Sequence, residues 1–413
     1  MTSTMTVWLM EPRDPLLVRD GRPFGSDPGA RAISLPFPFP STIAGGVRAR
    51  AGVDDDGLFP FTEKDRYAQE LQDLKSIQIY GPLLVQLAEE SNEIDDDQWL
   101  LAAPHDALFL SETAVTGGTA PRLEQLVPLQ LPPGAQTDLE TDVPLLVGLP
   151  HVTDQQKPLQ GAPGFWYWKH FHTWLLNPSL LMRQLAQREL SPARLGLRHL
   201  VYDHRMHVSI EAGKDIARDG MLFETAGLAF TALDPGNQRL RLAIAVATER
   251  QIKEGLAGFG GERRLVVWRK SQARLPACSQ ELEDAIVATG HCRLLLLTPA
   301  CFARGYAPTW LRDDTAKKGV QLELKAIALQ RPQVVSGWDL ALNRPKPSRR
   351  LAAAGTVLFL SLQGEEAAIR QWVRDTWMHC ISDRGEDRTD GFGLAVLGTW
   401  SGQAVPLERG EMQ

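Results

Sequence analysis

The sequence predicts an α+β protein in which the same order of strand, helix, glycine turn and strand occurs twice. Three observations support this prediction. Leucine, isoleucine and valine alternate with arginine and alanine from Arg239 to Ala247, which is typical of a strand with one buried face. A Gly-Phe-Gly tripeptide follows a predicted helix at residues 258–260 and again at residues 391–393. Each tripeptide precedes an apolar strand that ends in a tryptophan, Trp268 or Trp400.

The N-terminal part of the chain predicts a strand, a loop and a helix. Thr6 to Met10 is the expected strand, and the loop from Glu11 to Pro40 contains prolines that exclude a helix. Ser41 and Thr42 then open a helix rich in isoleucine, alanine and valine, where a hydroxyl can cap the free N–H groups. Gly52 can end this helix.

Apolar residues show no clear helical or strand periodicity over residues 53–200. The stretch is acidic and rich in proline, with short helical segments such as Asp65 to Leu74. We therefore expect large irregular insertions here rather than core elements.

Regular patterns return after Leu200. Short strands at Met206–Ile210 and Leu222–Phe230 flank the polar, glycine-bounded segment 211–220, which predicts a hairpin arm. The strand from Arg239 is followed by a predicted helix over Thr248–Leu256, the first Gly-Phe-Gly turn and the strand Leu265–Trp268. Strand, helix, turn and strand in this order form the second half of a ferredoxin-like unit.

The same order recurs near the C-terminus. A strand over Ala354–Leu362, a helix over Glu366–Cys380, the second turn and a strand over Leu394–Trp400 repeat it, and two further strands precede them, Cys292–Thr298 and Gln321–Leu329. We therefore predict two tandem ferredoxin-like domains. The first spans residues 1–275, with insertions at about 53–200 and the arm at about 211–220, and the second spans residues 276–413.

Charge is distributed unevenly along the chain. The 44 basic and 50 acidic residues give a net charge of −6, which by itself argues against a nucleic-acid partner. Residues 51–160, however, hold 20 acidic and five basic residues, so the rest of the chain is net basic. That remainder suits a polyanion, and the acidic block is either a solvated insertion or a surface that faces a basic partner.

Cysteine and apolar patterns restrict the compartment and the chemistry. The four cysteines, at 278, 292, 301 and 380, form no C-x-x-C pair, as expected of reduced thiols rather than of disulfides or a zinc site. No apolar run approaches the roughly 18 residues of a membrane span, and no signal segment opens the chain. We expect a cytoplasmic protein with no metal, no cofactor and no membrane partner.

The Gly-Phe-Gly turns have two possible roles. Their glycines let backbone N–H groups approach an anion closely, and the phenylalanine either anchors the loop in the core or stacks on a base. The alternative is a tight structural connection that needs a positive φ. The first turn precedes Arg263 and Arg264, which suits a phosphate backbone, but it is not a dinucleotide fingerprint because it does not open a helix.

Several segments together resemble one family. In chain order they are Glu11–Phe24, Pro40–Arg48, Arg218–Glu224, Gly260–Arg264, Ala354–Val357 and Gly391–Gly393. They are similar to the third Cmr protein family of the RAMP superfamily, whose members cap the 5′ end of the guide RNA in type III-B CRISPR effector complexes. Any one segment is weak evidence, but their shared order along the chain is specific.

The resemblance implies two RRM-type (ferredoxin-like) folds and a non-catalytic subunit of this antiviral complex. Such a subunit holds the 5′ tag of the crRNA, contacts a neighbouring RAMP backbone subunit and docks the large polymerase/cyclase subunit. Its arm, here with Lys214 and Arg218, inserts beside the guide–target duplex. The residues that would bind the tag are Ser41, Thr42, Gly45, Arg48, Arg50, Gly258, Phe259, Gly260, Gly261, Arg263, Arg264, Gly391, Phe392 and Gly393.

Other candidates come from residue chemistry alone. Arg19 and Arg22 flank a glycine in the first loop, and Arg344, Lys346, Arg349 and Arg350 lie in an acid-free, proline-containing run, so both segments could contact RNA phosphates or be solvated loops. Six aromatic residues between Phe165 and Trp174 favour a buried helix start or a subunit contact over base stacking. The histidine pairs at 170 and 172 and at 204 and 207 have no evident third metal ligand.

Two other functions are compatible with this fold. A guide-processing endoribonuclease of the RAMP type needs a general acid or base, usually a histidine, near the first helix or the glycine turns. The first histidine is His105, and neither turn has one within ten residues, so this alternative is disfavoured. A purely structural scaffold subunit is the other alternative, and RNA binding distinguishes it from the cap.

Overall fold

The computed structural model describes most of the chain. The described residues are 5–19, 31–61, 66–88, 93–111, 121–135, 137–138, 145–151, 157–211, 213–311, 316–317, 319–336, 338–339, 344–345 and 347–407. They form a mixed α+β structure that divides into two compact units. Unit 1 consists of Met1–Asp95, His199–Arg274 and Val334–Arg350, and unit 2 of Asp96–Arg198, Leu275–Gln333 and Leu351–Gln413. The chain passes from unit 1 to unit 2 near residue 275, where the domain boundary was predicted. Residues 96–198 also belong to unit 2, however, and residues 334–350 belong to unit 1.

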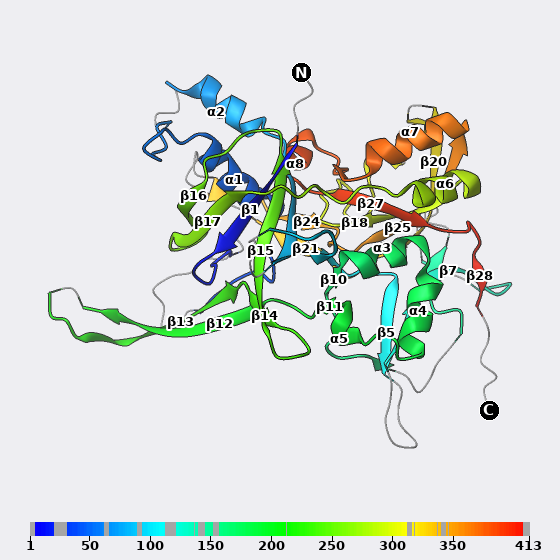
Figure 1. Cartoon of the computed structure of the whole chain (residues 1–413), viewed down its shortest axis with the longest axis horizontal. Coiled ribbons are helices and arrows are strands. Elements are labelled where there is room, and N and C mark those ends of the chain that lie inside the picture. The colour runs from blue at the N-terminus through cyan, green and yellow to red at the C-terminus, as the bar shows by residue number, and fades with distance from the viewer. Residues whose placement is uncertain are drawn as a thin grey trace, which may run out of the picture. The chain divides into compact units, whose positions relative to one another are not determined.

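An antiparallel sheet forms the centre of unit 1 (Figure 1). Within unit 1 its strand order is β3-β15-β1-β17-β16, and β14 pairs with residues 239–241 of β15. The strands are β1 (Thr6–Pro12), β3 (Tyr80–Leu87), β14 (Thr231–Leu233), β15 (Arg239–Thr248), β16 (Gly255–Phe259) and β17 (Arg264–Lys270). β15 is buried on both faces from Leu242 onward, so the prediction of one buried face is wrong there.

Helix α1 (Pro40–Ala51) packs on this sheet. Its N-cap is Phe39, and no side chain caps it, so Ser41 and Thr42 lie inside the first turn and the predicted hydroxyl cap is wrong. Gly46 allows a close approach, because a Cβ there would lie 2.6 Å from Cε2 of Phe259 and 3.4 Å from Cζ2 of Trp268. The predicted end at Gly52 is confirmed, and α2 (Ala68–Lys75) follows.

The predicted hairpin arm is present as β12 (Val201–Ile210) and β13 (Ala217–Ala229). The strands pair antiparallel from Val201 opposite Ala229 to Ile210 opposite Ala217, with a register shift after Val208. β2 (Arg31–Ile33) adds a short parallel strand to β13. The remaining strands that lie in unit 1 or at its boundaries are β21 (Gln333–Val335), β22 (Trp338–Asp339), β23 (Arg344–Pro345) and β24 (Arg349–Leu351).

Unit 2 has a second antiparallel sheet, of order β19-β20-β25-β18-β27-β26. Its strands are β18 (His291–Leu296), β19 (Ala316–Lys317), β20 (Val320–Ala328), β25 (Val357–Gly364), β26 (His379–Cys380) and β27 (Leu394–Thr399). The associated helices are α6 (Gln280–Thr289), η2 (Thr309–Leu311), α7 (Glu366–Thr376) and α8 (Gly385–Thr389). Ser279 caps α6 by accepting a hydrogen bond from the amide of Leu282, and Gly290 ends it in the left-handed conformation.

The rest of unit 2 comes from residues 96–198. Its helices are η1 (Asp96–Gln98), α3 (Trp168–Leu176), α4 (Pro178–Ala186) and α5 (Pro192–Leu195). Its strands are β4 (Trp99–Ala102), β5 (Ala107–Ser111), β6 (Arg122–Gln125), β7 (Val127–Gln130), β8 (Leu146–Gly148), β9 (Lys157–Pro158), β10 (Phe165–Tyr167) and β11 (Gly196–Leu197), and β28 (Val405–Pro406) pairs with β7. Of the predicted aromatic cluster, Trp166, Phe171 and Trp174 are buried, and the other three members are partly buried.

A buried ion pair fixes residues 96–198 to the C-terminal sheet within unit 2. The Nη1 atom of Arg293 lies 2.6 Å from Oδ2 of Asp106, and both side chains are fully buried. Arg293 also donates to the carbonyl oxygens of Trp174 and Thr399, and Trp174 Nε1 donates to Asp106 Oδ1. These contacts satisfy the charges that burial would otherwise make costly.

Two further sequence predictions are wrong in this architecture. Residues 53–200 are not irregular insertions outside the core, because β3 is hydrogen-bonded to β15 and its Leu83, Leu84 and Val85 are buried. The helix over Thr248–Leu256 is absent, since residues 249–254 are irregular and β16 begins at Gly255. The first Gly-Phe-Gly therefore ends a strand instead of following a helix. No helix among the described residues is long and apolar enough to cross a membrane.

Candidate RNA-binding surface

The first glycine turn is held against the N-terminal segment of unit 1. Gly260 has φ of +68°, and the amide of Gly261 donates to the carbonyl oxygen of Leu17 at 2.7 Å. Glu262 and Arg263 continue the turn in the left-handed region. The structure thus brings residues 258–264 beside Leu17, two residues before Arg19.

The side chains of this turn have different environments. Phe259 is buried against α1, so it anchors the turn in the core and is not available to stack on a base. Arg263 is exposed, as is Arg19. Arg264 is mostly buried and pairs with Glu262 at 2.6 Å. Exposure therefore favours Arg263 over Arg264 as a phosphate contact.

The segment before Arg19 is fixed by the base of the arm. Leu16 and Leu228 exchange two backbone hydrogen bonds, of 2.9 and 2.8 Å. The hydroxyl of Ser34 donates to the carbonyl of Leu16 and accepts from the amide of Val18. Arg22 lies outside the described residues.

The helix α1 candidates are partly structural. Gly45 is exposed, and a Cβ there would meet no atom within 4 Å. Arg48 is half-buried and donates to the carbonyl of Ile77. Arg50 is buried, its Nε and Nη2 donate to the carbonyl of Lys253, and burial lowers its pKa. Arg50 therefore fixes the irregular segment after β15 and has no free face for RNA.

The second glycine turn is a buried connection in unit 2. Gly391 and Gly393 have φ of +98° and +81°, and Phe392 is fully buried. Thr298 Oγ1 donates to the carbonyl of Gly391, and Ser382 Oγ donates to that of Phe392. Because Gly391, Phe392 and Gly393 are buried, the geometry favours a structural connection over RNA contact for this turn.

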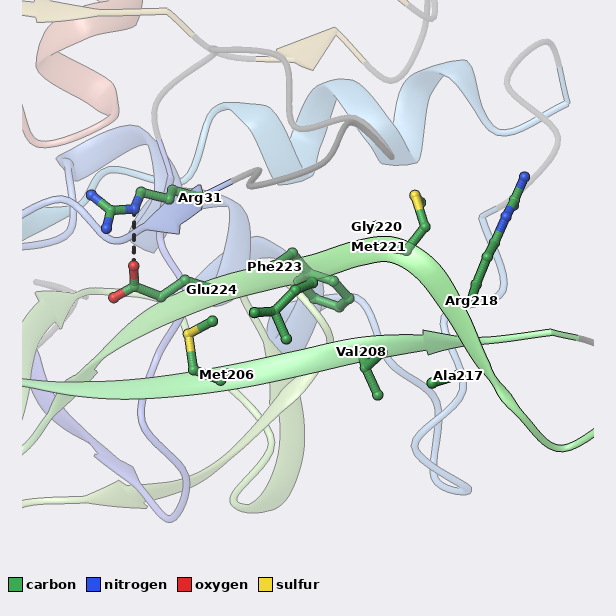
Figure 2. A pocket seen from close by; sticks show the side chains of 10 residues that line it. Arg31, Met206, Val208, Ala217, Arg218, Gly220, Met221, Phe223 and Glu224 are labelled. Atoms are coloured by element: carbon green, nitrogen blue, oxygen red, sulfur yellow. Dashed lines mark ion pairs between the residues drawn. The ribbon is translucent and has the colours of Figure 1, made fainter.

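The arm carries an open hollow of about 620 Å³ beside β13 (Figure 2). Figure 2 shows Arg31 and Glu224 at one end, Arg218 at the other and apolar side chains between them. The lining residues on the two arm strands include the exposed Met206, Val208 and Leu222, and Val208 lies directly opposite Leu222. The hollow is thus mainly apolar.

Charges on the arm are largely compensated. Glu224 accepts from His204 Nδ1 at 2.6 Å and pairs with Arg31 at 3.0 Å, and the hydrogen bond from His204 lowers its pKa. Lys214 pairs with Glu211 at 2.9 Å. Arg218 is exposed at the end of the hollow. Of the two predicted arm cations, Arg218 is therefore the better placed for RNA.

The basic run of residues 344–350 is only partly described. Lys346 and the side chain of Arg344 lie outside the described part. Arg349 is half-buried and Arg350 is exposed, and both belong to β24. The run therefore contributes Arg350 as a candidate that can reach solvent.

A cluster that sequence reasoning missed lies on the sheet of unit 1. Glu11 is buried and pairs with Arg241 Nη2 at 2.6 Å and Arg269 Nη1 at 2.8 Å, with Arg13 Nη2 at 3.9 Å. The arginines are separated widely in sequence, so only the strand register brings them together. The alternating Arg239 and Arg241 on β15 were the sole sequence signal.

The described residues contain no group of three or more histidine, cysteine, aspartate or glutamate side chains that could hold a metal ion. His204 bonds to Glu224, and His207 bonds to Thr225 and stacks on Phe223. Burial lowers the pKa of both His170 and His172. Hydrogen bonds, ring stacking and burial thus account for the surroundings of these four histidines.

Comparison with known proteins identifies the family. Residues 8–400 match the model of the family described as CRISPR-associated protein (Cas_Cmr3). Two solved structures also match, described as "Cryo-EM structure of the Type III-B Cmr-beta bound to cognate target RNA and AMPPnP, state 1" and the same assembly "bound to cognate target RNA"; each is 16% identical over 86% of both chains, with a TM-score of 0.44. No curated protein matches the chain. The family match confirms the resemblance carried by the sequence motifs, and the chain belongs to the Cas_Cmr3 family of CRISPR-associated proteins.

Proposed function

We propose that the chain is a non-catalytic RNA-binding subunit of a type III-B CRISPR effector complex, in which it caps the 5′ tag of the crRNA. Membership of the Cas_Cmr3 family over residues 8–400 is the observation that carries this proposal. The absence of histidine from residues 1–104 of the sequence and from within ten residues of either glycine turn supports a binding role over RNA cleavage.

The first glycine turn is the proposed centre of tag binding. Arg263 and Arg19 are exposed on segments that the Gly261–Leu17 hydrogen bond holds together. Arginine can donate to several phosphate oxygens at once, and phosphate contacts fix the register of a bound strand. The buried Phe259 keeps the turn in place for these contacts.

The arm is proposed to contact the guide–target duplex through apolar side chains. Residues 201–229 hold three Lys or Arg and five Asp or Glu, so the arm has no excess positive charge with which to bind phosphates. Met206, Ile210 and Leu222 are each more than half exposed. Apolar side chains of this kind can wedge between stacked bases.

Docking of the large polymerase/cyclase subunit is proposed for the acidic part of unit 1. Asp54, Glu70, Asp73 and Glu249 line a hollow of about 770 Å³, with Arg250 as the only basic residue among the described lining. An excess of carboxylates complements a basic protein surface and repels RNA. Substitution of Asp54 to Asp56 by asparagine should weaken docking and leave RNA affinity intact.

Both main sheets are proposed to be ferredoxin-like. If the four central strands of each sheet are numbered in chain order, β3-β15-β1-β17 and β20-β25-β18-β27 both read second, third, first and fourth, and all neighbours are antiparallel. Unit 1 has α1 between its first two strands, and unit 2 has α7 between its last two. This shared order supports a tandem duplication.

A filter-binding titration of tag RNA against the full chain tests the proposed function. We expect affinity to fall steeply with salt, and Arg263→Ala to reduce the slope of log affinity against log salt by about 0.7 for one lost phosphate contact. Arg304→Ala, which removes the same charge from an exposed position in unit 2, is the control. A chain with no salt-dependent affinity would contradict RNA binding, and tag cleavage would indicate the endoribonuclease.

A further inference from the structure

Three arginines converge on one buried carboxylate in the sheet of unit 1. Glu11 lies on β1, Arg241 on β15 and Arg269 on β17. The Glu11 carboxylate pairs with all three of Arg241, Arg269 and Arg13, and its side chain is only 9% exposed. Three neighbouring segments thus direct guanidinium groups to one point.

The charges of this cluster do not balance. Among the described residues, Glu11 is the only carboxylate that pairs with Arg13, Arg241 or Arg269. One negative charge therefore faces three positive charges, and the arginines repel one another. Burial alone would raise the pKa of Glu11, but the hydrogen bond from Arg241 and the charges of all three arginines lower it. A surplus of two positive charges remains for an anion.

The cluster is open to solvent on the side of the arginines. Their side chains are 50%, 34% and 31% exposed for Arg13, Arg241 and Arg269, while the carboxylate beneath them is nearly closed off. Arg269 lies opposite Leu9, and Glu11 lies opposite Val267, so both belong to one face of the sheet. The adjacent Trp268 points to the other face, where α1 packs.

We propose that Arg13, Arg241 and Arg269 form a second RNA-binding site, which takes one or two phosphodiester groups of a single strand at the solvent-exposed side of these arginines. This inference rests on the proposed RNA-binding function. Arginine presents a planar fork of donors that matches phosphate oxygens. Glu11 acts as a positioning residue, because it holds the guanidinium groups in place and leaves part of each free to contact an anion.

Salt titration of RNA binding to the full chain tests this site. The probe is a single-stranded oligouridylate, and the variants are Arg241→Gln and Arg13→Gln. For each, we expect affinity to fall about fivefold or more and the salt slope to decrease by about 0.7 per lost phosphate. Arg250→Gln is the matched control, because it removes the same charge from an exposed position just beyond the other end of β15.

The design separates the possible failures. If the wild-type chain shows no salt-dependent RNA affinity, the proposed function fails and this site with it. If the wild type binds but both variants keep its slope and affinity, the phosphate site alone is overturned. Should Arg241→Gln fail to fold, Arg13→Gln decides, because Arg13 is half exposed and 3.9 Å from the carboxylate.

A free nucleotide offers the same phosphate chemistry, so a competition arm distinguishes the two sources. Uridine monophosphate at matched ionic strength should leave the oligouridylate bound, because one nucleotide lacks the neighbouring contacts of a strand. Displacement from the wild type that is lost in Arg241→Gln would assign the site to a free nucleotide and overturn the RNA assignment.

Discussion

Removal of Asp106 should destabilise unit 2 strongly. The Asp106 carboxylate is the partner of Arg293, and both side chains are fully buried. In Asp106→Ala, the guanidinium of Arg293 keeps its hydrogen bonds to carbonyl oxygens but loses its counter-charge. Trp174 Nε1 loses its acceptor as well.

The expected loss is about 3–5 kcal/mol, the range for a buried ion pair deprived of one partner. Arg293→Met should cost a similar amount, because the Asp106 carboxylate then stays buried without a cation. The double variant Asp106→Ala with Arg293→Met buries no charge, so it should lose less than the sum of the two single variants. The difference between the loss in the double variant and the sum of the two single losses is the coupling free energy of the two side chains.

Urea unfolding of the full chain, followed by tryptophan fluorescence, provides the assay. Arg205→Ala is the control, because Arg205 pairs with Asp203 at 2.7 Å on an exposed part of the arm. Such a pair should contribute about 1 kcal/mol or less. A loss in Asp106→Ala no larger than in this control would refute the reasoning, and with it the role of residues 96–198 in the unit 2 core.

Two further predictions concern pH and backbone geometry. Burial lowers the pKa of His105 to about 4, with partial compensation from Asp106, against about 6.5 when unfolded. The unfolded chain therefore binds the proton first, and stability should fall by at most about 3 kcal/mol as pH drops from 6.5 to 4. In His105→Gln, the urea midpoint should depend less on pH over this range. A pH dependence equal to that of the wild type would contradict the prediction. Gly260→Ala should cost about 1–2 kcal/mol in thermal unfolding, since φ is +68° and its Cβ would lie 2.8 Å from the carbonyl oxygen of Leu17. Gly45→Ala in α1, where a Cβ has space, should instead stabilise by about 0.5–1 kcal/mol, and equal effects would refute the account of the turn.

Local patterns were sufficient for the elements whose partners are near in sequence. The arm follows from two strands around a polar, glycine-bounded segment, and the structure confirms it as β12 and β13. β15 follows from alternation, although its alanine face is buried too, as Ala243 and Ala245 show. Alternation cannot tell a small buried residue from a neutral exposed one.

Tertiary contacts explain the predictions that failed. The segment after β15 has helical composition, but Arg50 holds the carbonyl groups of Lys253 and Glu254 and prevents them from accepting helical hydrogen bonds. β3 lies between acidic stretches that resemble a solvated insertion, yet its pairing with β15 places it in the sheet. Arg50 and β3 are each far in sequence from the segment that they contact.

The candidate site was predictable only in part. Arg263 and Arg19 were found from glycine-rich motifs, and the structure leaves both exposed. Motif matching could not separate the open first turn from the buried Phe392 turn, because the tripeptides are identical. The Glu11 cluster depends on register across three strands, so no local pattern identified it.

Crosslinking of the tag in the assembled complex tests the central claim most directly. A crRNA with 4-thiouridine in its 5′ tag would be bound, irradiated and digested, and the crosslinked peptides identified by mass spectrometry. We predict crosslinks in unit 1, in the peptides that carry Arg19 and residues 258–264. Tag crosslinks confined to other subunits of the complex would contradict the proposal that this chain caps the guide RNA.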